Sequence, residues 1–189
     1  MSDDFKSARF WARELLESAV FPGAQAIDAT MGGGRDTLWL CARTGEMGHV
    51  YAFDVQADAL TRTRALLAAE GMGARATLCH AGHQDMEKYV TAPVDAVVFN
   101  LGWLPGGEKG VTTLVDTTRA AVCAGTRLLK PTGLMTICVY PGHDEGAREL
   151  SALTDWASSL DPSQFDVMLR RYMNQTNDPP QMIAIRKRV

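Results

Sequence analysis

The residues best suited to chemistry gather in one short stretch, residues 28–37, which reads Asp-Ala-Thr-Met-Gly-Gly-Gly-Arg-Asp-Thr. The apolar run before it, residues 24–27, predicts a short buried strand, and the apolar spacing from Asp36 onward predicts a helix. Glycines in such a turn permit backbone angles closed to other residues and let a ligand approach the main chain. The N-terminus of the helix adds unpaired N–H groups at its positive end. This stretch therefore predicts the nucleotide-binding turn of an open α/β sheet.

The acid that precedes the glycines distinguishes this turn from a dinucleotide-binding one. Asp28 stands four residues before Gly32, and a carboxylate at the end of the strand would repel a pyrophosphate. The same carboxylate attracts the amino group or the sulfonium of S-adenosylmethionine, both of which are positively charged. The pattern Asp-x-x-x-Gly-x-Gly therefore favours a methyltransferase over an NAD-dependent oxidoreductase. An ordinary tight turn between a strand and a helix is the alternative interpretation.

The composition is that of an ordinary globular protein. The chain has 189 residues, of which 46% are apolar and 22% charged, and we interpret residues 1–189 as one domain. Its apolar runs are too short to cross a bilayer, and its first residues lack the features of a signal peptide, so we expect a cytoplasmic protein without membrane contact. Its four cysteines stand far apart and predict buried thiols, with no metal site. The sequence leaves a homodimer open.

Apolar periodicity predicts strands that alternate with helices along the chain. The predicted strands span residues 24–27, 48–54, 74–79, 94–99 and 134–140. The predicted helices span residues 5–19 (within an outer layer formed by residues 1–20), 36–43, 56–69, 112–129 and 144–159, with a short helix after residue 85. A turn is predicted at residues 130–133, and residues 165–172 and 182–185 predict a closing antiparallel pair. This order predicts a parallel sheet with right-handed crossovers and a C-terminal hairpin at one edge.

Ligands of such sheets bind over the carboxyl ends of the strands. That rule brings the glycine turn together with Asp54, about twenty residues further on, where nucleotide-binding folds place a carboxylate on ribose hydroxyls. It also adds the polar segments that follow the third, fourth and fifth strands. We therefore expect the cofactor to be bound by Asp28, Thr30, Gly32, Gly34, Asp36, Thr37, Asp54, Gln56, His83 and Asn100.

The segment after the fourth strand, Asn100-Leu101-Gly102-Trp103, is suited to holding a methyl acceptor. An amine reacts only when its lone pair faces the methyl group, and a carbonyl oxygen that holds an N–H enforces that direction. Asn100 is therefore a predicted catalytic residue, and Trp103 offers a face for stacking a base. Trp103 as a core residue is the alternative. The predicted substrate-binding residues are Leu101, Trp103, Lys109 and Tyr140.

Histidines and basic residues provide further candidates. His143 is predicted to take the proton of the amine or to bind phosphate, and His83 to contact adenine or the acceptor; a helix cap or a hydrogen-bonded loop histidine is the alternative for each. The net charge of −3 gives no overall attraction to a polyanion, so RNA needs a local basic patch. We expect that patch to be formed by Lys109 with the C-terminal cluster of residues 170–171 and 186–188.

Four segments resemble a family of small bacterial class I methyltransferases labelled "putative rRNA methylase". They are Asp28-Ala-Thr-Met-Gly-Gly-Gly-Arg-Asp-Thr, Ala52-Phe-Asp-Val-Gln, Phe99-Asn-Leu-Gly-Trp-Leu-Pro-Gly-Gly-Glu-Lys and Tyr140-Pro-Gly-His. The family includes the tRNA methyltransferase that acts on the 5-aminomethyl group of wobble uridine. Three positions depart from its usual pattern, since Gly33 replaces an asparagine, Arg35 replaces a common histidine, and Pro141 replaces a histidine.

The resemblance implies a Rossmann-like class I methyltransferase fold, with a mostly parallel seven-stranded sheet and a C-terminal antiparallel hairpin. It also implies S-adenosylmethionine as cofactor and an RNA substrate, tRNA first, methylated on nitrogen by in-line displacement. The residues leave three alternatives open: methylation of rRNA, methylation of a small-molecule amine, and a non-catalytic protein that binds S-adenosylmethionine.

Overall fold

The computed structural model describes residues 7–102 and 112–189. The helices are α1 (Ala8–Leu16), α2 (Arg35–Thr44), α3 (Ala57–Ala69), α4 (Val115–Leu128) and α5 (Asp144–Ser158), with the short 3-10 helices η1 (Gly73–Arg75) and η2 (His83–Lys88). The strands are β1 (Gln25–Asp28), β2 (His49–Asp54), β3 (Ala76–His80), β4 (Val94–Asn100), β5 (Leu129–Val139), β6 (Phe165–Arg170) and β7 (Gln181–Lys187).

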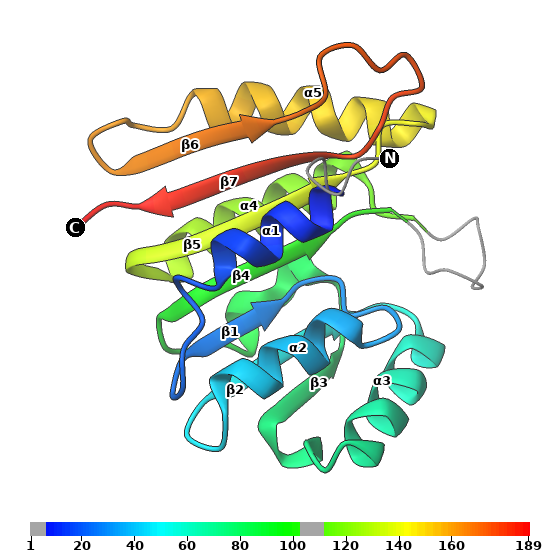
Figure 1. The fold of residues 1–189 in the computed structure, drawn as a ribbon, viewed down its shortest axis with the longest axis vertical. Helices are drawn as coiled ribbons and strands as arrows, with labels where there is room; N and C mark the ends of the chain where they lie inside the picture. The colour runs from blue at the N-terminus through cyan, green and yellow to red at the C-terminus, as the bar shows by residue number, and fades with distance from the viewer. Residues whose placement is uncertain (1–6, 103–111) are drawn as a thin grey trace.

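The seven strands form one sheet in the order β3-β2-β1-β4-β5-β7-β6 (Figure 1). The first five strands pair in parallel, whereas β7 runs antiparallel to both β5 and β6. The sequence-based fold class is therefore confirmed, including the C-terminal hairpin. The chain leaves β1 toward β2 and later returns to β1's other side as β4, so the topological switch point of the sheet lies between β1 and β4.

Helices cover both faces of the sheet, so strand residues are buried on both sides. One face packs against α1 and α2 and includes Ala26, Val98 and Cys138. The other face packs against α4 and α5 and includes Ile27, Phe99 and Ile137. Successive residues of one strand thus enter opposite cores, as the pleat requires. In Figure 1, α1 and α2 lie in front of the sheet and α4 behind it.

The predicted turn at residues 130–133 is wrong. These residues belong to β5, where the pairing with β4 shifts register between Val94 and Ala96. Thr132 has a positive φ of 65°, and the extra residues are accommodated as a bulge-like irregularity rather than as a turn between elements. The side chain of Lys130 donates to both carboxylate oxygens of Asp95, at 2.9 and 2.8 Å, and ties the irregular segment to β4.

The fourth long helix also begins later than predicted, at Val115 instead of residue 112. The backbone N–H of Thr113 donates to the carbonyl of Gly102 at 3.2 Å, and the N–H of Gly102 donates to the hydroxyl of Thr113 at 3.0 Å. The same hydroxyl donates to the buried Glu149 at 2.8 Å. These hydrogen bonds join Gly102 to Thr113, just before α4, and so connect the segments on either side of residues 103–111.

Within the two described ranges, the structure has no helix that is both long and apolar enough to span a membrane.

Candidate active site

A cavity of about 820 Å³ lies over the carboxyl ends of the parallel strands. Its volume is in the range of small-molecule and cofactor sites. Its wall combines the turn after β1, the ends of β2, β3 and β4, and the residues that lead into α4. The predicted site residues that line it are Thr30, Gly32, Asp36, Asp54, Gln56, His83, Asn100, Leu101 and Tyr140.

Four predicted residues do not belong to the described cavity wall, namely Asp28, Gly34, Thr37 and His143. Two more, Trp103 and Lys109, lie outside the described residues, so their substrate-binding roles stay predictions. The cofactor-binding and catalytic roles of the other residues are also predictions, although these residues are now placed on the cavity wall or beside it.

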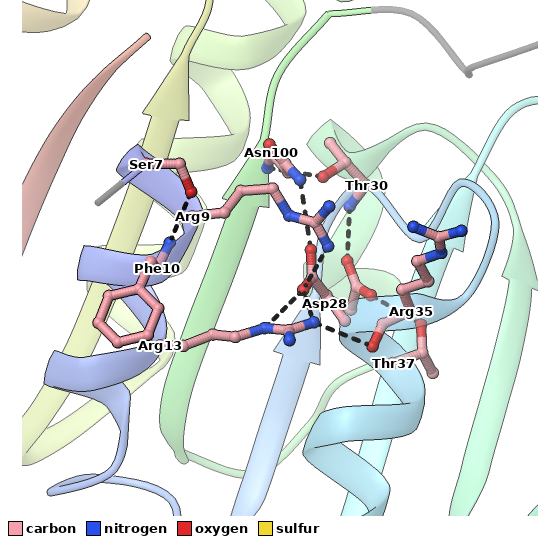
Figure 2. Close-up of polar contacts among 10 residues, drawn as sticks. Ser7, Arg9, Phe10, Arg13, Asp28, Thr30, Arg35, Thr37 and Asn100 are labelled. Carbon is pink, nitrogen blue, oxygen red and sulfur yellow. Dashed lines mark hydrogen bonds and ion pairs between the residues drawn. The ribbon is translucent and has the colours of Figure 1, made fainter. Parts of the chain in front are cut away.

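Asp28 lies beneath the turn and is 1% exposed. Its carboxylate accepts a hydrogen bond from the hydroxyl of Thr37 at 2.7 Å and another from the N–H of Thr30 at 3.2 Å (Figure 2). Burial and the nearby charge of Asp36 raise the pKa of Asp28 to about 7, against the effect of these hydrogen bonds. Asp28 and Thr37 therefore brace the turn from inside the protein instead of facing the cavity.

The three glycines of the turn have different surroundings. The N–H of Gly32 donates to Asp54 at 3.0 Å, which connects the turn to the end of β2. Gly34 has a positive φ of 80°, and a Cβ there would lie 2.8 Å from the hydroxyl oxygen of Thr63 in α3. A Cβ at Gly33 would meet no atom within 4 Å, and Gly33 lies on the cavity wall. Gly34 therefore permits helix packing, whereas Gly33 leaves its backbone open to a ligand.

Asn100, at the end of β4, contacts a cluster of charged side chains formed by Asp36, Arg9 and Arg13. Its Nδ2 donates to Oδ2 of Asp36 at 3.3 Å, and its backbone N–H donates to the hydroxyl of Thr30 at 2.8 Å. The other carboxylate oxygen of Asp36 accepts from Arg9 at 2.9 Å and from Arg13 at 2.7 Å. Figure 2 shows both arginines reaching from α1 toward the end of β4.

The arginines of α1 are the part of the site that sequence reasoning missed. Arg9 and Arg13 stand four residues apart, so they project from one side of the helix, and Arg9 lines the cavity. Their spacing shows only that the two arginines share one side of a helix, and no pattern in the sequence identifies Asp36 as their partner. From the sequence, residues 1–20 are predicted only to form an outer layer.

The two predicted histidines have separate surroundings. His83 is buried beside Phe99, with ring centroids 5.8 Å apart, and burial lowers its pKa to about 4. It is therefore a neutral ring on the cavity wall at neutral pH. His143 is the N-cap of α5, where its Nδ1 accepts from the N–H of Gly146 at 3.1 Å. The structure thus places His143 in the helix cap that was its alternative interpretation.

The expected basic patch is wrong for residues 186–188. Arg186 pairs with Leu134, which lies beside Ala96 near the start of β4, toward the end of the sheet opposite the cavity. There it donates to the carbonyl of Thr132 at 3.0 Å, and Arg188 pairs with Asp166. Because β7 is antiparallel, its basic end points away from the ligand-binding edge. The basic residues that do line the described cavity wall are Arg9, Arg35 and Arg62.

The wall suits S-adenosylmethionine. It offers open glycine backbone, the carboxylate of Asp54 for ribose hydroxyls, and the exposed apolar side chain of Val55 for an adenine ring. When bound, this cofactor supplies an electrophilic methyl group on a sulfonium. The sheet order, the hairpin and this site define a class I S-adenosylmethionine-dependent methyltransferase.

Comparisons with known proteins identify the family. The family model described as "Putative rRNA methylase" matches residues 50–186. A structure from Clostridium thermocellum, described as a "putative rRNA-methylase", is 35% identical with a TM-score of 0.95, and the alignment covers 97% of this chain and 98% of that one. A "putative methyltransferase" from Streptococcus mutans in complex with SAH is 36% identical with a TM-score of 0.88, covering 97% and 99%. The chain belongs to the "Putative rRNA methylase" family.

A curated relative comes from a plant. The chloroplastic tRNA (mnm(5)s(2)U34)-methyltransferase of Arabidopsis thaliana is 39% identical over an alignment of 171 residues, which covers 85% of this chain. The chain spans only 62% of the length of that relative. A second relative, the ribosomal RNA small subunit methyltransferase H of Thermomicrobium roseum, is 36% identical over 42% of this chain and 25% of its own length.

Proposed function

We propose that this chain methylates RNA on nitrogen, and that its acceptor is the 5-aminomethyl group of the wobble uridine of tRNA. The observation that carries the proposal is the side-chain oxygen of Asn100. Asn100 lines the cavity, and its Oδ1 is buried with no hydrogen-bond partner in the described part of the chain. Buried polar atoms are usually satisfied, so this oxygen is suited to a donor that a substrate brings.

An aliphatic amine fits this acceptor. If Asn100 Oδ1 accepts an N–H of the neutral amine, the lone pair is held in a defined direction, and orientation of this kind contributes strongly to methyl transfer. The amide is neutral, so it does not form an ion pair with a sulfonium as a carboxylate would. The carbonyl of Leu101, the next residue on the wall, is a second candidate acceptor.

The choice of tRNA rests on the plant relative, whose name specifies mnm(5)s(2)U34. Methylation of rRNA is the second candidate, because the family description and the partial match to a ribosomal RNA methyltransferase both point to it. Exposed Arg35 at the cavity wall offers a cation for an RNA phosphate in either case.

Transfer of a radiolabelled methyl group identifies the acceptor. Bulk tRNA and rRNA from cells that lack this protein are incubated with the purified enzyme and labelled S-adenosylmethionine, and the nucleosides are then analysed by mass spectrometry. We expect label in a wobble uridine of tRNA. Label confined to rRNA would select the second candidate, and label in neither RNA would contradict the proposal.

Asn100→Ala tests the orienting role directly. We expect a roughly 100-fold lower rate of methyl transfer, the scale of one lost oriented contact, with little change in cofactor affinity measured by calorimetry. Asn100→Asp keeps the shape and an acceptor oxygen but loses the NH2 donor to Asp36 and adds a charge, so it should also be slower than the wild type. A wild-type rate in Asn100→Ala would remove Asn100 from the reaction.

The salt dependence of tRNA binding tests Arg35. Arg35→Gln should lower the slope of log affinity against log salt by roughly one unit, because one phosphate contact is lost. Arg188→Gln is the matched control, since Arg188 lies at the opposite end of the sheet, and it should leave the slope unchanged. Equal slopes in the wild type and both variants would exclude a phosphate contact by Arg35.

A further inference from the structure

We propose that Asp36 is a positioning residue that fixes the orientation of the Asn100 amide, and that Arg9 and Arg13 hold Asp36 in the ionised state this requires. The proposal deepens the proposed function and rests on the orienting role of Asn100. It replaces the expectation that Asp36 itself binds the cofactor.

The two carboxylate oxygens of Asp36 have separate partners. Oδ1 accepts from NH2 of Arg9 at 2.9 Å, and from Nε and NH2 of Arg13 at 3.2 and 2.7 Å. Oδ2 accepts from Nδ2 of Asn100 at 3.3 Å. The Asp36 side chain is only 15% exposed, so these contacts are partly shielded from water. One oxygen therefore binds the helix α1, and the other binds the residue at the end of β4.

Asp36 is ionised in this setting. Burial opposes the charge, but the guanidinium groups of Arg9 and Arg13 outweigh burial and hold the pKa of Asp36 below its usual range. An ionised carboxylate only accepts hydrogen bonds. It can therefore bind the NH2 group of Asn100 but not the amide oxygen.

This restriction determines which way the amide faces. A flipped Asn100 would place its oxygen against the Asp36 carboxylate, so two acceptors would meet. With the NH2 group held by Asp36, Oδ1 takes the opposite position, where it is buried without a partner among the described residues. The bond from the Asn100 backbone N–H to Thr30 fixes the main chain at the same point. The oxygen that accepts the substrate N–H is thus oriented before the substrate binds.

The arrangement also explains why α1 contacts the site. Arg9 and Arg13 are about one-third exposed, with side-chain exposures of 35% and 36%. They form ion pairs with the first turn of α2, and through Asp36 they act on a residue of β4. A helix on the outside of the sheet thereby sets the charge of a group at the catalytic edge.

Asp36→Asn is the main test, and Asp95→Asn is its matched control. Asp95 is also a partly buried carboxylate, 12% exposed, that pairs with a cation (Lys130) and accepts a backbone N–H, from Gln25. It lies near the start of β4, at the end of the sheet away from the cavity. With tRNA as acceptor, Asp36→Asn should lower kcat about 10-fold or more and leave the KM for S-adenosylmethionine within about 2-fold. Asp95→Asn should leave both constants unchanged.

The double variant separates action through Asn100 from independent action. If Asp36 acts through Asn100, then Asp36→Asn added to Asn100→Ala should lower kcat no further. Additive effects would overturn the proposal, as would a large increase of the KM for S-adenosylmethionine in Asp36→Asn, which would return Asp36 to cofactor binding. A wild-type kcat in Asn100→Ala would instead contradict the proposed function.

Nuclear magnetic resonance tests the geometry without any acceptor. The side-chain NH2 signals of Asn100, assigned by their loss in Asn100→Ala, should show one proton protected from exchange in the wild type and in Asp95→Asn. That protection should be lost in Asp36→Asn. Unchanged protection in Asp36→Asn would overturn the proposal even if the acceptor is not tRNA.

Discussion

Asp28 and Asp36 are eight residues apart and lie at two sides of the same turn, yet their surroundings are opposite. Asp28 is wholly buried with a hydroxyl and an N–H as partners, and its pKa is raised to about 7. Asp36 faces the cavity with two guanidinium groups, and its pKa is lowered. Both carboxylates are desolvated, so the neighbouring cations account for the difference.

Within one motif, Asp28 supports the turn, whereas Asp36 contacts the residues of the cavity. The Asp28 side holds the shape of the turn through contacts that end inside the protein. The Asp36 side connects three elements, and Oδ1 of Asn100, a residue of the cavity wall, has no hydrogen-bond partner among the described residues. An acid in a glycine-rich motif therefore need not contact the ligand, because its role depends on which neighbours the fold supplies.

The largest expected effect concerns the pH dependence of stability at Asp28. The unfolded state loses this proton near pH 3.8 and the folded state near pH 7, so between these values the folded state holds one more proton, and stability falls as pH rises. The difference amounts to about 4 kcal/mol as an upper bound. Asp28→Asn cannot ionise, so its free energy of unfolding relative to the wild type should rise from pH 4 to pH 8. Urea titrations across this range measure the difference, and parallel pH profiles would contradict the raised pKa.

A smaller effect is expected within the glycine turn. Gly34→Ala places a Cβ against Thr63 and a side chain at positive φ, so it should lower the free energy of unfolding by about 2 kcal/mol. Gly33→Ala is the control, because a Cβ there meets nothing within 4 Å; it should change stability by less than about 0.5 kcal/mol. Denaturant titration of both variants measures this, and equal losses would show that the two glycines are not distinguished by packing.

The smallest effect on stability is expected at Asp36. Asp36→Asn removes ion pairs to arginines that are about one-third exposed, so solvent screening limits the loss to about 1 kcal/mol near neutral pH. The folded pKa is lowered, so this contribution is present above the unfolded value of 3.8 and is lost as pH falls through the folded value. Thermal unfolding at pH 7 and pH 3 should show the variant closer to the wild type at the lower pH. If the stability difference between Asp36→Asn and the wild type grew toward low pH, the lowered pKa of Asp36, and with it the contrast to Asp28, would be contradicted.

Much of the fold was predictable from local patterns. Largely apolar runs such as residues 94–99 identify strands buried on both faces, and their alternation with helices leads to a parallel sheet. The boundaries that failed, at residues 112–114 and 130–133, were decided by distant partners. Thr113 is held by Gly102 and Glu149, and Lys130 by Asp95, and no local spacing reports such contacts.

The sequence by itself determined that the polar and glycine-rich segments share one edge of the sheet, because the carboxyl ends of parallel strands coincide there. Only the tertiary structure decided which side chains on that edge face the cavity. Asp28 turned inward and the basic residues 186–188 lie at the far end of the sheet, while Arg9 and Arg13 reached the site from an outer helix. The reason is physical: backbone pattern follows from local burial, whereas the partner of a charged side chain depends on which elements pack beside it.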